Sequence, residues 1–495
     1  MADPPEGFRR AVLRGLAWKS TSRVLFEVTK LTVAVVLARL LTPEQYGLAG
    51  MVLVLAAFEP VLSGVALASV LVQRREVSED LRCTVFWATV ATGACSTVVG
   101  VALSGLVADF YGDAEVQGLF AAMSCCFVIS ALGMAQSHLL VREMDFRALE
   151  LRAMAGVVVG AVLGIGAAAM GYGPWALVIQ QLATYTTSTV LLWRFSPWRP
   201  RLRFSRTALR DVRGFGGHVS GTLLLNQLTQ NTDNVLIGRY LGASALGAYA
   251  LAYNIILVPF SRLSAPLHEV LYPVFSRLQD DRARLAALWL RVVRMVATLA
   301  VPAMLALVIL AADVIDTVFG ARWQDAVPVV RILAFVGMLL VLQGLNAVVL
   351  QAVGETRRLL HYSMAAFVAG LGAFILGLQW GITGVAACFA VVSTVMQPLY
   401  MALTARSVGA SARDCVRALS GVVQASALMA AAVLVVHQLL VAADVAPPLR
   451  LVVCVLVGGA VYVPASAWRS RAVIEELMRL LRGSAGPAVV RAGGR

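Results

Sequence analysis

The sequence predicts an all-α polytopic membrane protein of about fourteen transmembrane helices, built as two pseudo-symmetric six-helix lobes plus two C-terminal helices. Of 495 residues, 59% are hydrophobic and only 14% are charged, and the mean hydropathy is +0.81. Apolar runs of about twenty residues recur from end to end, and each is long enough to cross a bilayer. This composition excludes an ordinary soluble domain.

The predicted spans are separated by short connections. They cover residues 14–40, 46–72, 83–108, 116–140, 150–170, 174–193, 215–238, 244–275, 286–312, 327–351, 359–379, 382–404, 418–441 and 448–467. An even number of helices places both termini on the same side of the membrane.

The net charge of +14 would suit a nucleic-acid partner, but its distribution indicates membrane topology. Arginine-rich connections alternate with short, often acidic ones such as LTPEQYG, ADFYGDAE and DTVFGARWQD. Cytoplasmic loops of membrane proteins carry an excess of Lys and Arg. We therefore expect the basic loops and both termini on the cytoplasmic side of a bacterial inner membrane, and we expect no nucleic-acid partner.

The sequence contains no motif that indicates a catalytic site or a metal site. The seven cysteines show neither metal-ligand spacing nor a disulfide framework, so we predict no metal site, no cofactor and no catalytic residue. A membrane polysaccharide polymerase or ligase is the enzyme alternative, but such enzymes work on a sizeable outer loop, and every predicted outer loop here is short. A purely structural membrane scaffold is a further alternative.

The two halves of the chain match at a constant offset of 200 residues. LTVAVVLARLLTPEQYGLAG lies over NTDNVLIGRYLGASALGAYA, which pairs Arg39 with Arg239 and Gly47 with Gly247. Internal duplication is typical of transporters that handle substrate between their halves. The predicted divisions are a cytoplasmic N-terminus (1–13), an N-lobe (14–193), a basic linker (194–214), a C-lobe (215–405), two further helices (406–467) and a cytoplasmic tail (468–495).

Charged residues lie on one face of the first span. Lys19, Arg23, Glu27 and Lys30 are spaced by four, four and three residues, and therefore fall within about 80° of helical arc. Charge at membrane depth normally faces a bundle interior or a wet cavity. This cationic stripe suggests an anionic substrate, with Arg262 of the eighth span as a further partner. Snorkelling of Lys19 and Arg23 to headgroups is the alternative.

The seventh span carries a dense polar face over about 160° of helical arc. Its members are Asn226, Gln227, Gln230, Asn231, Asp233 and Asn234. Such a face must meet protein or water. It is expected to line a cavity and bind sugar hydroxyls, or alternatively to hold helices together by hydrogen bonds. Under the 200-residue offset, Gln227 and Gln230 overlie Glu27 and Lys30.

Intramembrane carboxylates are candidates for charge balance or ion coupling. Glu59 precedes Pro60, where a kink would free a backbone carbonyl. Glu59 is expected to pair with Lys30 or Arg23, or alternatively to take up a coupling H⁺ or Na⁺. Glu27 and Asp233 are further candidates for the same role.

Three segments carry a family resemblance that covers nearly the whole chain. ARLLTPEQYGLAGM, DNVLIGRYLGASALGAYALAYNI and RILAFVGMLLVLQGLNAVVLQAVGETRR resemble segments of the polysaccharide transporters in the multidrug/oligosaccharidyl-lipid/polysaccharide flippase superfamily. They are most similar to the colanic-acid and teichuronic-acid exporter branch.

The resemblance implies flipping of polyprenyl-pyrophosphate-linked oligosaccharides from the cytoplasmic to the outer leaflet. It implies as partners the lipid-linked oligosaccharide, the bilayer and polysaccharide assembly machinery, and we expect a monomer. The alternatives within transporters are a lipid-linked peptidoglycan precursor flippase and a multidrug cation antiporter. The cationic stripe argues against the antiporter, because a site for cationic drugs would favour carboxylates.

Overall fold

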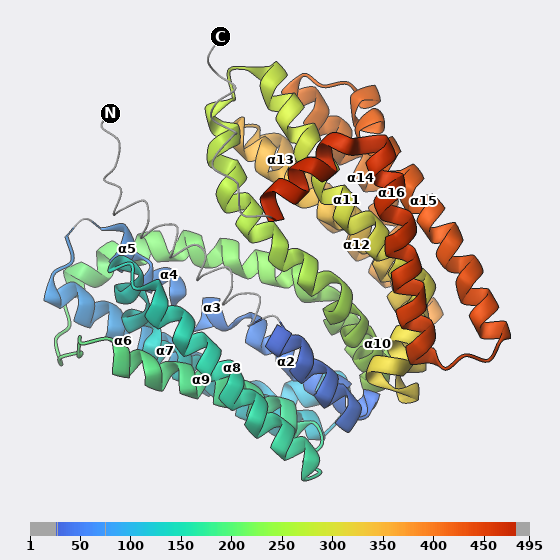
Figure 1. Cartoon of the computed structure of the whole chain (residues 1–495). Coiled ribbons are helices and arrows are strands. Elements are labelled where there is room, and N and C mark those ends of the chain that lie inside the picture. Colours follow the sequence, from blue (N-terminus) through green and yellow to red (C-terminus); the bar gives the residue numbers. More distant parts are fainter. Residues whose placement is uncertain (1–25, 27, 75, 482–495) are drawn as a thin grey trace. The chain divides into compact units, whose positions relative to one another are not determined.

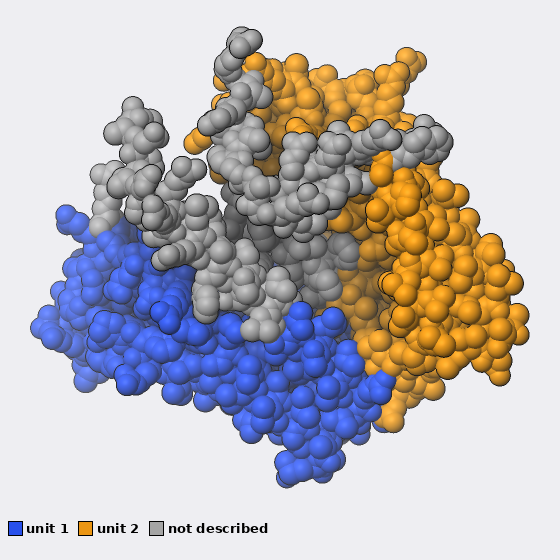
Figure 2. Space-filling view, in the orientation of Figure 1, with its two compact units in different colours: residues 1–250 blue, residues 251–495 orange. Residues whose placement is uncertain are grey.

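The computed structural model describes residues 26, 28–74 and 76–481. Within them, side chains are described except at 208–223, 225, 226, 228, 229, 257–270 and 468–481. Every regular element in these ranges is helical, as predicted. The chain divides into two compact units, residues 1–250 and 251–495 (Figure 2). The lobe limits predicted from the internal repeat stay a prediction.

The first unit contains four long helices that overlay the third to sixth predicted spans (Figure 1). They are α6 (Glu79–Tyr111), α7 (Glu115–Arg142), α8 (Phe146–Ala169) and α9 (Trp175–Phe195). Small residues let them approach closely, as is usual between membrane helices. A Cβ added at Gly93 of α6 would lie 2.7 Å from the Phe127 carbonyl oxygen of α7.

The second predicted span is not one helix. It consists of α2 (Pro43–Ala57), α3 (Glu59–Leu62), α4 (Val65–Ala68) and α5 (Val70–Gln73). The Thr42 side chain caps α2 by accepting from the Gln45 amide at 3.2 Å. Pro60 begins the next piece, and Gly64 adopts a φ of 87° that side-chain-bearing residues rarely tolerate. Hydropathy marked this segment as apolar but did not register its breaks.

The seventh and eighth predicted spans lie in α10 (Arg206–Arg277), which is interrupted at Gly242. Gly242 has φ 86° and ψ 179°, so the helical segments 206–241 and 243–277 meet there at a sharp break. Under the 200-residue offset Gly242 corresponds to Thr42, where α2 begins. The two copies of the repeat therefore break their helices at equivalent positions.

The second unit continues with helices that overlay the ninth to fourteenth predicted spans. They are α11 (Arg282–Val314), α12 (Val327–Ala352), α13 (Thr356–Gly377), α14 (Gly381–Val408), α15 (Ala412–Ala442) and α16 (Pro447–Leu481). Its core gathers buried apolar side chains around Trp289, including Val293, Leu345 and Val349. In the described part of the chain, nine helical stretches are long and apolar enough to cross a membrane, and one of them, Thr356–Val408, contains both α13 and α14. The total of fourteen stays a prediction.

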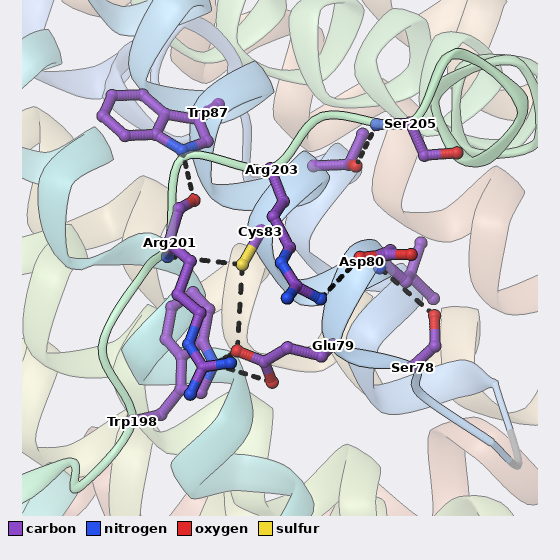
Figure 3. Close-up of polar contacts among 11 residues, drawn as sticks. Ser78, Glu79, Asp80, Cys83, Trp87, Trp198, Arg201, Arg203 and Ser205 are labelled. Atoms are coloured by element: carbon purple, nitrogen blue, oxygen red, sulfur yellow. Dashed lines mark hydrogen bonds and ion pairs between the residues drawn. The ribbon is translucent and has the colours of Figure 1, made fainter.

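The basic linker is fastened to the N-terminal end of α6 (Figure 3). Trp198 Nε1 donates to the Glu79 carboxylate at 3.0 Å, and Trp87 Nε1 donates to the Arg201 carbonyl at 2.9 Å. Further contacts are Ser205 N to Thr84 Oγ1 at 2.9 Å and Arg203 Nη1 to Asp80 Oδ1 at 3.6 Å. The linker residues up to Ser205 therefore belong structurally to the first unit.

A buried ionic cluster ties the last two helices to α11. Asp313 Oδ1 accepts from Arg450 of α16, with Nε at 2.8 Å, and Asp313 Oδ2 contacts His437 Nε2 of α15 at 2.7 Å. The Asp313 side chain is 1% exposed. Removing one partner of such a cluster leaves the other charge without compensation in a low-dielectric site.

We expect Asp313→Asn to destabilise the protein by about 3–5 kcal/mol, because Arg450 loses its counter-charge. The measurement is the midpoint of thermal unfolding in detergent. Glu355→Gln is the matched control, since Glu355 pairs with Arg358 at 3.1 Å on the surface and such pairs contribute about 0–1 kcal/mol. Equal midpoints for the two variants would show that the Asp313 cluster does not stabilise the fold.

Candidate functional site

The polar face predicted for the seventh span lies on the first segment of α10. Gln227 Nε2 donates to the carbonyl oxygen of Ala57, the last residue of α2. Asn231 Nδ2 donates to the Gln227 carbonyl at 2.8 Å, within the same helix. Gln230 is exposed, whereas the side chain of Asn226 lies outside the described residues. This face therefore meets α2 at Gln227 and leaves Gln230 accessible.

Asp233 holds the two segments of α10 together. Its Oδ2 accepts from the Tyr249 hydroxyl at 3.0 Å, across the break at Gly242, and its Oδ1 accepts from the Asn234 amide at 2.8 Å. Asp233 is 5% exposed. This geometry favours interhelical hydrogen bonding over a cavity wall at Asp233, whereas Asn234 is half-buried.

The cationic stripe is described only at Lys30. Lys19, Arg23 and Glu27 lie outside the described residues, and so does the side chain of Arg262. Lys30 lies in the helical residues 28–40, is half-buried, and places its ammonium 4.3 Å from the centre of the Phe26 ring. Convergence of the four cations stays a prediction.

Glu59 lies where the second span breaks, as the first residue of α3. Its carboxylate lies near Ser130 of α7 and within electrostatic range of Arg152 of α8. The sequence predicts Lys30 or Arg23 as its partner, and this pairing stays a prediction, because Arg23 lies outside the described residues. The structure adds Arg152 of α8.

Arg152 belongs to an interior polar cluster that the sequence analysis missed. We call Glu59, Ser130, Arg152, Gln181 and Tyr185 the interior polar cluster. Arg152 is half-buried and donates from Nη2 to Ser137 Oγ at 3.2 Å. Tyr185 lies near Gln181 on α9 and within electrostatic range of Glu59.

One signal of this cluster was present in the sequence. Gln181 and Tyr185 are four residues apart in the apolar α9, so they share one helical face. The position of Arg152 gave no comparable signal, because it follows closely on the basic connection that contains Arg142 and Arg147. In chemical terms, the cluster offers one carboxylate, one guanidinium and neutral hydrogen-bonding groups. Over the described residues, no group of three or more His, Cys, Asp or Glu side chains could hold a metal ion.

Comparison with known proteins gives a family and several relatives. A family model described as "Polysaccharide biosynthesis protein" matches residues 36–328. The lipopolysaccharide biosynthesis protein WzxC of Escherichia coli (strain K12) is 28% identical over 333 residues, which cover 67% of this chain and 68% of that protein. The teichuronic acid biosynthesis protein TuaB of Bacillus subtilis (strain 168) is 26% identical over 382 residues, covering 75% and 79%. The succinoglycan biosynthesis transport protein ExoT of Rhizobium meliloti (strain 1021) is 27% identical over 368 residues, covering 74% of each.

Two groups of solved structures share the fold. The lipid II flippase MurJ in an inward closed conformation superposes with a TM-score of 0.74 at 13% identity, covering 92% of this chain and 99% of that one. An inward-facing multidrug resistance transporter of the MATE family, in the MOP superfamily, gives a TM-score of 0.62 at 16% identity, covering 78% and 94%. At these identities the likeness establishes the fold alone.

We expect a cysteine at Gln230 to react with a water-soluble thiol reagent and one at Asp233 to stay protected, in a chain without native cysteines. The reason is that Gln230 is exposed whereas Asp233 is enclosed by Tyr249 and Asn234. Labelling rates in intact membranes check this. Equal protection at both positions would mean that the whole polar face serves as interhelical contact.

Proposed function

Because the chain belongs to the polysaccharide biosynthesis protein family, we propose that it flips a lipid-linked oligosaccharide across the cytoplasmic membrane for export of a surface polysaccharide. Three relatives are named for the biosynthesis or transport of lipopolysaccharide, teichuronic acid and succinoglycan. The chain is then a transporter and not an enzyme, and it shares its fold with known flippases and exporters.

The observation that carries this proposal is the polar face of α10 inside an apolar span. The exposed Gln230 offers an amide donor and an amide acceptor, which suit sugar hydroxyls, between the half-buried Gln227 and Asn231. Lys30, which is equivalent to Gln230 in the repeat, supplies a half-buried cation. A substrate with an anionic diphosphate at one end and neutral sugars at the other fits this division.

The alternatives differ in what the site must bind. A lipid-linked peptidoglycan precursor has the same diphosphate chemistry, and a flippase for lipid II shares the fold. The relatives named above favour a surface polysaccharide instead. A multidrug cation exporter also shares the fold, but Lys30 and the predicted Arg23 would repel a cationic drug.

Replacing the cations of the stripe distinguishes a flippase for a lipid diphosphate from an exporter of cationic drugs. Lys30→Gln and Arg23→Gln each keep length and polarity but remove a charge-assisted contact to phosphate. Such a contact contributes about 1.5–3 kcal/mol, so export should fall by about tenfold or more. Surface polysaccharide is measured in a strain that lacks the native gene, with protein abundance checked in the membrane.

The matched control for the stripe is Arg203→Gln. Arg203 pairs with Asp80 at 3.6 Å in the linker, with 56% of its side chain exposed, so its loss should leave export near normal. If Lys30→Gln, Arg23→Gln and their combination all export as the unchanged chain does, the anionic-headgroup mechanism is wrong.

Export against a concentration difference requires an energy source, and we propose that Glu59 takes up the coupling H⁺. Its support is geometric: the carboxylate lies inside the membrane at a helix break, beside Ser130 and Arg152. A carboxylate that gains or loses a proton there changes its interaction with Arg152. That change alters how α3 packs against α7. Na⁺ is less suited because Arg152 would repel it.

Glu59→Gln keeps the shape of the side chain but cannot exchange a proton. We expect it to abolish export driven by a pH gradient, while Glu59→Asp retains part of it and Glu115→Gln, at an exposed position, retains all. Vesicles with an imposed pH gradient provide the measurement. Undiminished gradient-driven export by Glu59→Gln would assign coupling to another group.

We propose that both termini and the basic linker lie in the cytoplasm, with the chain acting as a monomer beside polysaccharide assembly enzymes. The support is the alternation of arginine-rich and acidic connections, since cytoplasmic loops carry an excess of Lys and Arg. A phosphatase fused after Arg206 should be inactive, because this reporter works only outside the cytoplasm. Activity at that position would reverse the topology.

A further inference from the structure

The two halves of the internal repeat touch through the glycine that they share. α2 crosses the second segment of α10 at Gly47 and Gly247. A Cβ added at Gly47 would lie 2.9 Å from the Gly247 amide nitrogen, and one added at Gly247 would lie 3.1 Å from the Gly47 amide nitrogen. Real Cβ atoms rarely come so close to a facing backbone, so the crossing requires glycine on both helices.

The contacts are reciprocal under the 200-residue offset. The added Cβ at Gly47 would overlap the carbonyl group of Ala243, and the one at Gly247 would overlap the carbonyl group of Pro43. Pro43 and Ala243 are themselves equivalent, as the first residues after Thr42 and Gly242. Gly47 of the first copy meets Ala243 of the second, and Gly247 of the second copy meets Pro43 of the first. A local two-fold axis produces such a reciprocal contact. This axis runs through the glycine crossing.

The side chains that flank the crossing are buried. Tyr46 and its equivalent Leu246 are 9% and 1% exposed. A Cβ added at Gly50 would lie 3.6 Å from Leu246 Cδ2, so Leu246 fills the space beside the crossing. Two backbones in direct contact, flanked by buried side chains, leave little room for water between α2 and α10.

The crossing lies at the opposite end of α6 from the basic linker. A Cβ at Gly238, just before the break, would lie 2.9 Å from Tyr111, the last residue of α6. The linker binds the first turns of the same helix at Glu79 and Asp80. The 33 residues of α6 span about 50 Å. The crossing is therefore on the side of the membrane away from the basic loops, which is the outer side in the topology proposed above.

We propose that the Gly47–Gly247 crossing is a reversible seal that closes the transport path on the outer side, and that α2 and the second segment of α10 must part there to release substrate. The proposal rests on the transport function proposed above. Each copy of the repeat contributes the same helix to the seal, so the duplication supplies both halves of the gate. At Gly47 and Gly247 no side chain stands between the two backbones, which suits a joint that opens and closes repeatedly.

A disulfide across the crossing tests the seal. Gly50→Cys and Leu246→Cys are combined in a chain without native cysteines, since the added Cβ at Gly50 lies 3.7 Å from Leu246 Cγ, within disulfide reach. Mild oxidation should bridge α2 to α10, reduce export to the level of a strain that lacks the gene, and be reversed by reduction.

The matched control bridges two helices that are not expected to part. Val433→Cys with Gly458→Cys joins α15 to α16, where the added Cβ at Gly458 lies 3.3 Å from Val433 Cγ2. Its oxidation should leave export unchanged. Continued export by the oxidised Gly50/Leu246 pair, or failure of that pair to bridge under conditions that bridge the control, would overturn the proposal.

A second readout needs no export. With Gln230→Cys as an added reporter, labelling by a membrane-impermeant thiol reagent from outside should be lost when the seal is bridged and return on reduction. Unchanged labelling would overturn the seal even if export stops. If labelling responds while no surface polysaccharide depends on the chain, the seal holds and the proposed substrate is wrong.

Discussion

A polar group inside a bilayer must find its partner within the protein, because hydrocarbon offers none. The position of the polar residues in this chain follows from that constraint. Asp313 binds Arg450 and His437 between three helices, and Asp233 binds Tyr249 across the break in α10. Glu59 lies beside Ser130 and Arg152. The Asp313 and Asp233 hydrogen bonds each join helical segments that are separate in the fold.

The same constraint separates what could be predicted from sequence from what could not. Span positions follow from hydropathy, because a run of about twenty apolar residues forms a helix that crosses the bilayer. Helices α6–α9 and α11–α16 overlay their predicted ranges. The kink expected at Pro60 is present, because α3 begins there. The further break at Gly64 escaped prediction, because that glycine changes backbone geometry without changing hydropathy.

For the candidate site, the sequence identified polar residues but not their partners. The polar face of α10 was visible as a cluster, yet only three-dimensional contacts distinguish the exposed Gln230 from the enclosed Asp233. Arg152 was hidden by its proximity to a basic loop, and its interaction with Glu59 joins positions nearly a hundred residues apart. Pairing of that kind depends on helix order and rotation, which hydropathy does not contain.

The two copies of the repeat share the glycines at their crossing but differ in the polar residues before it. At the crossing, Gly47 and Gly247 remain glycine because the opposing backbone occupies the space of any side chain. In the helical segments directly before the crossing, Lys30 and Gln230 occupy equivalent positions with different chemistry. Duplication thus preserves the residues that bring α2 and α10 together. The preceding segments differ between the two copies, one carrying Lys30 and the other the amide of Gln230.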